Sequence, residues 1–208
     1  MSSQQLSGIV SEKYESGGRG VATVSTGKGD AGGVSYGKHQ LSSKSGTMAA
    51  FLNSKFGSAY KARFGATKPG NKDFSAIYSA IAKERPLEFA TNQFLYIAAT
   101  HYDPQVAKLK ANGIDVANRN VAVQECVFSV SVQYGPNTSL IVNALKTNFK
   151  GTDAEFISKV QEYRKNTVGV YFKSSSKKTQ QSVADRAVDE QNDLLKLLNT
   201  PQSPQQLA

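Results

Sequence analysis

Glu15-Ser-Gly-Gly-Arg-Gly and Asp30-Ala-Gly-Gly-Val-Ser-Tyr-Gly-Lys-His-Gln40 mark the two ends of the stretch that decides how we interpret this chain. Eight of the 17 glycines of the 208-residue chain lie between Gly17 and Gly37. Glycine lets the backbone turn tightly and approach a ligand closely. Because the stretch also carries two carboxylates, Glu15 and Asp30, we expect it to shape a cleft.

The rest of the sequence is typical of a helical protein. Residues 3–14 place apolar side chains three and four positions apart, which predicts an amphipathic helix. Ser16-Gly17-Gly18 would end this helix, so that Glu15 stands at its C-terminal edge. Further helices are expected from residue 45 and over residues 72–84, 86–102, 103–112, 119–134, 137–148, 153–166 and 178–198.

Two of these helices have particular sequence signals. The valine-rich residues 121–132 would also suit a strand, but their length and their helical neighbours favour a buried helix. Thr152 and Glu155 have the spacing of a capping box, which predicts a helix that begins after Thr152.

Short Val- and Thr-containing pieces within residues 19–38 predict a small β-hairpin lobe. The predicted fold class is therefore mainly α with a small β-hairpin lobe. The length suits a single domain, which we place at residues 1–200. The Gln- and Pro-rich residues 201–208 are expected to be a disordered tail.

Composition limits the possible environments of the protein. The formal net charge of +9 favours an anionic partner. The one cysteine, Cys126, excludes an intrachain disulfide and is expected to be buried and inert. The sequence shows no secretory leader and no apolar run near the roughly 20 residues of a membrane span. The chain is therefore expected to be made in the cytoplasm and delivered by another agent.

Glu15 and Asp30 together suggest acid–base chemistry. Glycoside hydrolysis uses one protonated and one ionised carboxyl group on opposite sides of a sugar. Glu15 could act as the general acid and Asp30 as the general base, and the hydroxyl of Ser35 could help to hold the attacking water. In the alternative interpretation, Glu15 is a solvated charge at a helix end and Asp30 is an ordinary turn residue.

Three motifs carry a resemblance to a known family: Glu15-Ser-Gly-Gly, Asp30 five residues before Ser35, and Gly33-Val-Ser-Tyr-Gly-Lys-His-Gln40. Together they resemble the lysozyme superfamily, in particular its chitosanase-like branch. That branch includes the C-terminal muramidase domains of type VI secretion spike proteins and some phage endolysins.

The resemblance implies a lysozyme-like, two-lobed architecture with a catalytic glutamate at the end of a helix. It also implies that Tyr36 and Gln40 contact a sugar substrate. His39 is expected to line the cleft, and Tyr134, at the end of a central helix, to contact substrate. By this resemblance the protein is a muramidase that cleaves the β-1,4 bond between N-acetylmuramic acid and N-acetylglucosamine, with inversion. It would then be bacteriolytic, in phage lysis or as an antibacterial effector.

This interpretation also predicts the partners and the place of action. Peptidoglycan glycan strands would be the substrate, and an anionic outer-membrane surface would attract the basic protein. The protein is expected to be a monomer, to bind no nucleic acid and to need no cofactor. Two histidines, His39 and His101, make a weak metal signal, so no metal site is predicted. Action on the cell wall would follow release by a holin or delivery by a secretion system.

Two other functions stay open on the sequence. A lytic transglycosylase would use Glu15 without Asp30. A non-enzymatic protein that binds nucleic acid or the cell wall would use the positive charge alone.

Three further features were weighed. Glu12 shares a helix face with Glu15 and is an alternative acid. Glu125 lies in an apolar helix and needs a partner. An ion pair with Arg119, Arg164 or a lysine is expected, although a role behind the cleft is the alternative. Gly27-Lys28-Gly29 lacks the full spacing of a phosphate-binding loop and is set aside.

Overall fold

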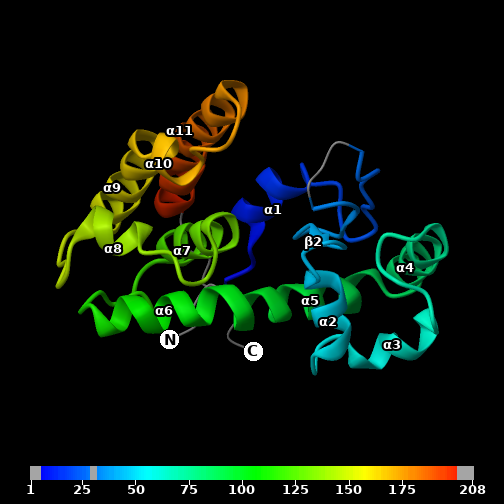
Figure 1. Ribbon diagram of the computed structural model, residues 1–208. Helices are drawn as coiled ribbons and strands as arrows, with labels where there is room; N and C mark the ends of the chain where they lie inside the picture. The colour runs from blue at the N-terminus through cyan, green and yellow to red at the C-terminus, as the bar shows by residue number, and fades with distance from the viewer. Residues whose placement is uncertain (1–5, 29–31, 201–208) are drawn as a thin grey trace. The chain divides into compact units, whose positions relative to one another are not determined.

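The computed structural model describes residues 6–28 and 32–200 (Figure 1). These residues are mostly helical and contain one two-stranded antiparallel sheet, so the predicted class of mainly α with a small hairpin is confirmed. No helix among them is both long enough and apolar enough to cross a membrane.

The described chain divides into two compact units. The smaller unit comprises residues 11–99, and the larger unit comprises the rest. The chain passes between the units twice, within α1 (Ile9–Glu15) and within the π-helical turn η1 (Ala98–Tyr102). The prediction of a single domain over residues 1–200 stays a prediction, and residues 201–208 lie outside the described part.

The smaller unit is built around an aromatic core. Its helices are α2 (Thr47–Asn53), α3 (Ser58–Phe64), α4 (Lys72–Glu84) and α5 (Pro86–Ile97). Pro86 occupies the first turn of α5, where its missing N–H costs nothing. The buried aromatic side chains come from the hairpin and all four helices: Tyr36, Phe51, Tyr60, Phe64, Phe74, Tyr78, Phe89 and Tyr96.

The hairpin of the smaller unit lies later in the chain than predicted. Strand β1 (Ser35–Tyr36) pairs with β2 (Leu41–Ser42), and Val24 forms an isolated bridge with Tyr36. Most of the predicted 19–38 lobe therefore has irregular backbone that is fixed by individual hydrogen bonds. One of these joins the amide of Gly37 to the carbonyl oxygen of Thr23 at 2.8 Å.

The larger unit is a helical bundle. Its helices are α6 (Asp103–Ala111), α7 (Val121–Tyr134), α8 (Leu140–Leu145), α9 (Asp153–Asn166), α10 (Val168–Tyr171) and α11 (Lys177–Asn199). The valine-rich α7 is a buried helix, as predicted, and contacts α6, α8, α9 and α11. The capping box at Thr152 is also confirmed, with both of its hydrogen bonds formed.

One buried hydrogen-bond centre fixes the hairpin of the smaller unit to its helices. The hydroxyl of Tyr78 donates to the carbonyl oxygen of Val21 at 2.7 Å and accepts from Nε2 of Gln93 at 2.9 Å. Gly37 lies directly against this pair. A Cβ at this position would be 2.1 Å from Oε1 of Gln93 and 2.5 Å from the hydroxyl of Tyr78.

Gly37→Ala tests this close packing, and Gly18→Ala is the matched control. Both glycines have a positive φ, +73° and +70°, but a Cβ at Gly18 would meet no atom within 4 Å. The control should lose about 1–2 kcal/mol from backbone strain alone. Gly37→Ala should lose roughly 3 kcal/mol or more, because the clash adds to the strain. Urea unfolding measures both, and equal losses would contradict the packing role of Gly37.

Candidate functional site

Glu15 is the last residue of α1, as the sequence predicted, and its side chain is half-buried. The backbone leaves the helix through Gly17 and Gly18, which both have positive φ values. A Cβ at either glycine would meet no other atom within 4 Å. The glycine loop that follows Glu15 therefore has open space around Gly17 and Gly18.

An ion pair ties α1 to the hairpin. Nζ of Lys38 lies 2.9 Å from Oε2 of Glu12, and both side chains are partly shielded from solvent. Glu12, the alternative acid of the sequence analysis, is therefore paired with a cation. No local sequence pattern predicts this pair, because the two residues are 26 positions apart.

Ser35 and Gln40 are held on the hairpin by backbone geometry. The amide of Ser35 donates to Oγ of Ser25 at 2.8 Å, and the amide of Ser25 donates back to the carbonyl oxygen of Ser35. Gln40 has a φ of +50°, and its Nε2 donates to the carbonyl oxygen of Gly37 at 2.8 Å. This bond directs the amide nitrogen of Gln40 to the turn of its own hairpin.

Tyr36 is a core residue of the smaller unit. Its side chain is fully buried against Phe74 and Tyr78. Its hydroxyl is 3.0 Å from Oγ of Ser75 and accepts from the amide of Gly70 at 2.8 Å. A residue with this burial and these partners has a packing role, so we leave Tyr36 out of the site.

His39 is buried on the hairpin near Phe94, with a ring-centroid distance of 6.3 Å. Asp30 lies outside the described residues, and Tyr134 belongs to the larger unit. The smaller unit thus contains Glu15, Ser35, His39 and Gln40. The described residues include no group of three or more His, Cys, Asp or Glu side chains that could hold a metal ion.

Glu125 has a structural partner that the sequence analysis missed. This buried carboxylate accepts hydrogen bonds at 2.8–3.4 Å from the backbone amides of Ser7, Gly8 and Val10, and one from the hydroxyl of Ser7. It thus satisfies amides at the N-terminal end of α1 that have no partner within the helix.

The predicted ion pair of Glu125 with Arg119 or Arg164 is therefore wrong. Arg119 pairs with Asp153 at 2.7 Å, and Arg164 pairs with Glu190. Glu125 is instead stabilised by backbone amides and one hydroxyl, which a search for cationic residues cannot reveal.

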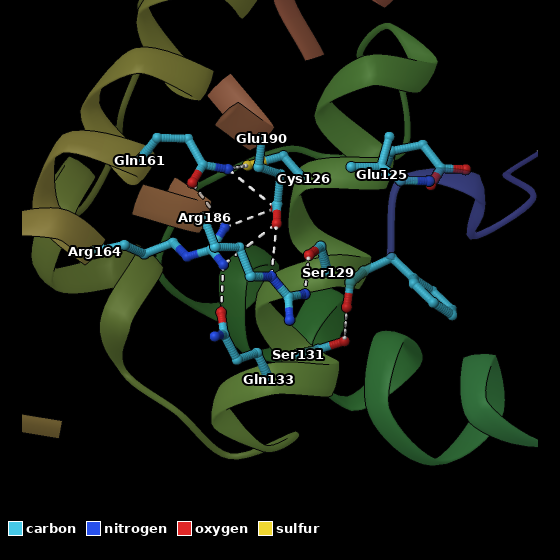
Figure 2. Close-up of polar contacts among 11 residues, drawn as sticks. Glu125, Cys126, Ser129, Ser131, Gln133, Gln161, Arg164, Arg186 and Glu190 are labelled. Carbon is cyan, nitrogen blue, oxygen red and sulfur yellow. Dashed lines mark hydrogen bonds and ion pairs between the residues drawn. The ribbon is translucent and has the colours of Figure 1, made fainter. Parts of the chain in front are cut away.

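A buried ionic network joins three helices of the larger unit. Figure 2 shows the guanidinium groups of Arg164 and Arg186 converging on the carboxylate of Glu190. Nη1 of Arg164 is 2.6 Å from Oε1 of Glu190, and Nε of Arg186 is 3.3 Å from Oε2. The side-chain oxygens of Gln161 and Gln133 accept further hydrogen bonds from Nη1 and Nη2 of Arg164.

The network sets the charge state of Glu190. Burial alone would raise the pKa of this carboxyl group, but the positive charges of Arg164 and Arg186 and the hydrogen bonds to it outweigh burial and lower the pKa. Since α7, α9 and α11 each supply members, the network fixes the mutual packing of these helices.

Tyr134 packs on this network rather than standing alone. Its ring lies 5.5 Å from the guanidinium carbon of Arg164 and contacts Tyr171 and Phe172 edge to face. Burial raises the pKa of its hydroxyl. Cys126 lies beside the network, and burial raises the pKa of its thiol to about 12, so it is an inert core residue, as predicted.

Two cavities in the larger unit lie away from every predicted site residue. One, of about 390 Å³, lies between α6 and residues 113–118. The other, of about 280 Å³, lies between α9 and α11. Neither is lined by Glu15, Ser35, His39, Gln40 or Tyr134.

Comparison with known proteins assigns this chain to a family. Residues 7–191 match the family model described as type VI secretion system spike protein VgrG3-like, C-terminal. The type VI secretion system spike protein VgrG3 of Vibrio cholerae serotype O1 is 40% identical over 192 residues. That alignment covers 91% of this chain and 18% of the relative.

These matches correct the predicted identity and activity. The family and the relative are described as a secretion spike protein, and neither description gives a lysozyme, muramidase or other glycoside hydrolase. The prediction of a lysozyme-superfamily muramidase in a phage endolysin or lytic enzyme is therefore wrong. The motifs that carried the resemblance lie within residues 15–40, whereas the family match spans residues 7–191.

The predicted partners are corrected by the same finding. Peptidoglycan strands and an anionic outer-membrane surface were inferred from the muramidase prediction and from net charge, and a spike-protein family supports neither. Action on the cell wall and release by a holin lose their support with them.

Glu125 and Glu15 should differ in how much stability the protein loses when their charge is removed. Glu125→Gln replaces one of the two acceptor oxygens with an NH2 group and removes the charge that four hydrogen-bond donors face, and should lower the free energy of unfolding by about 1–3 kcal/mol. Glu15→Gln should change it by about 0.5 kcal/mol at most, or raise it, because the helix dipole disfavours a carboxylate at the C-terminal end of α1. Denaturant unfolding at neutral pH compares them. A loss at Glu15 as large as that at Glu125 would make Glu15 a structural residue.

Glu190 should make stability depend on pH. Its folded-state pKa lies below the ordinary 4.5, so its contribution is complete above pH 4.5 and is lost as pH falls through the folded-state pKa. Near neutral pH, Glu190→Gln should cost about 3–5 kcal/mol, because two arginines lose their buried counter-charge.

The exposed Glu162 on α9 provides the control for this measurement. Glu162→Gln should stay within about 0.5 kcal/mol of wild type. The difference between wild type and Glu190→Gln should shrink as the solution is acidified. A difference that stays constant down to about pH 3 would contradict the assignment of this pH dependence to Glu190.

Proposed function

Because the chain belongs to the family of C-terminal domains of VgrG3-like type VI secretion system spike proteins, we propose that it is a domain exported with such a spike. The observation that carries the proposal is the family match over residues 7–191, which includes both units. The 40% identity to a spike protein over 91% of the chain supports it independently.

We infer that the chain is a domain attached to a spike protein and not the part that forms the spike. The chain spans only 18% of the length of the V. cholerae relative. Most of what makes that protein a spike therefore lies outside the aligned region. We propose that this domain travels on the spike and that its first partners are other components of the same secretion system.

We propose that four polar residues of the smaller unit belong to the functional site of this domain. Glu15, Ser35, His39 and Gln40 lie on α1 and the hairpin, which the Glu12–Lys38 pair joins. Asp30 is included in this proposed site because of its place in the sequence motif alone. A lysozyme-like arrangement of two lobes remains a prediction about fold, from which we propose no activity.

Export can be measured in the bacterium that encodes the chain. An epitope tag on the encoded full-length protein should allow its detection in the culture medium. Deletion of the contractile sheath gene of the type VI system should reduce the signal to the level of a cytoplasmic marker protein, which controls for lysis. Equal release with and without the sheath gene would contradict export by this system.

A further inference from the structure

The cavity of about 390 Å³ in the larger unit has the size of a small-molecule site. Such sites usually have volumes of about 300–1,000 Å³ and combine an apolar lining with a few polar groups. One wall of this cavity is α6, and the other is the chain segment of residues 113–118. Its apolar lining comes from Val106, Ile114, Val116 and Ala117.

The turn that ends α6 fixes the start of the second wall. The amide of Gly113 donates to the carbonyl oxygen of Lys110 at 3.0 Å, and the amide of Ile114 donates to that of Leu109 at 3.0 Å. This pair of bonds is a Schellman motif, which needs a positive φ at Gly113, and φ is +72° there. A Cβ on Gly113 would lie 2.1 Å from Oδ1 of Asn148, so the turn packs closely against the chain behind it.

Arg119 fixes the end of the same wall. Its Nε donates to the carbonyl oxygen of Asp115 at 2.9 Å, and its Nη1 lies 2.7 Å from Oδ1 of Asp153. Between these two anchors, the side chains of Ile114 and Val116 are buried. The cavity is therefore formed by the fold itself, and a ligand would not have to order its walls.

Two opposite charges line this cavity. Lys110 is exposed, and in the described part of the chain it forms no ion pair. The carboxylate of Asp115 accepts a hydrogen bond from Nδ2 of Asn118 at 2.9 Å. This bond lowers the pKa of the Asp115 carboxyl group, so the group is ionised at neutral pH. The cavity thus offers one cation and one anion beside apolar side chains.

This combination selects among classes of small molecule. A phosphate-bearing ligand would meet the negative charge of Asp115, and a metal ion would find a single carboxylate beside a cation. A zwitterion satisfies both charges, because its carboxylate can pair with Lys110 and its ammonium group with Asp115. An apolar side chain on the same molecule would lie against the apolar lining.

We propose that this cavity binds a free α-amino acid with an apolar side chain. The site would be separate from the proposed site of the smaller unit, and it goes beyond the proposed export, which does not depend on it. A residue within a peptide chain lacks both charges and would not be recognised in this way.

The test is a titration of the full chain, labelled with nitrogen-15, by nuclear magnetic resonance. L-Leucine is the probe, and a Kd of about 1 mM or tighter is expected for a ligand of this size. The amide signals that shift should be those of residues 106–118. 4-Methylpentanoate lacks the ammonium group and 3-methylbutylamine lacks the carboxylate, so each should bind at least about fivefold more weakly than L-leucine.

Single substitutions test the two charges. Lys110→Met and Asp115→Asn should each weaken the binding of L-leucine at least about fivefold. Lys178→Met and Asp189→Asn make the same changes at exposed residues of α11 that do not line the cavity, and should bind like wild type. The amide spectrum of each variant shows whether it is folded.

Three results would overturn the proposal. The first is the absence of shifts at residues 106–118 up to roughly 20 mM L-leucine, a concentration that would saturate a site of the expected affinity. The second is equal binding of L-leucine and either analogue. The third is wild-type affinity in a folded Lys110→Met variant. Each would leave the proposed export standing, because sheath-dependent release is measured separately.

Discussion

The buried ion pair of Arg164 and Glu190 is the constraint on which the larger unit depends. Neither charge reaches solvent, and each would be costly to bury alone. Arg186, Gln161 and Gln133 add further hydrogen bonds to the pair, and these bonds offset part of the cost of burying its charges. These five side chains come from three helices, so a helix that slid or rotated would leave a buried charge without a partner. The network therefore specifies one packing of α7, α9 and α11, where an apolar core alone would allow several.

The smaller unit obtains the same specificity from neutral groups. The hydroxyl of Tyr78 joins the irregular backbone at Val21 to the side chain of Gln93 on α5. Gly37 fits against both partners because it has no side chain. The hairpin has only two residues in each strand, too few to be stable without such support. Its position is therefore set by the aromatic core and this hydrogen-bond centre.

The elements that the sequence predicted well are those with local signals. Helix α9 begins at its capping box, and α5 begins at Pro86. The elements predicted poorly depend on residues far apart in the chain. The strands lie beyond most of the 19–38 lobe, at the position where Tyr36 packs against Tyr78 of α4. The partner of Glu125 lies 118 residues away at Ser7 and is a backbone amide, which no pattern of charged side chains can reveal.

The same distinction explains how a motif can suggest a wrong activity. The motif Ser-Tyr-Gly-Lys-His-Gln resembles the lining of a sugar cleft, but several of its residues have structural roles in this chain. Tyr36 fills the core, Gly37 avoids a clash, and Lys38 pairs with Glu12. A short motif that fixes a hairpin against helices can occur in any protein with that packing. Its presence therefore does not identify the activity of a nearby site. A residue whose side chain serves only packing and internal contacts gives no information about which activity the protein has. Glu15 differs from them because it is half-buried at the end of α1 and is not part of the aromatic core, so it is the better residue on which to test a function.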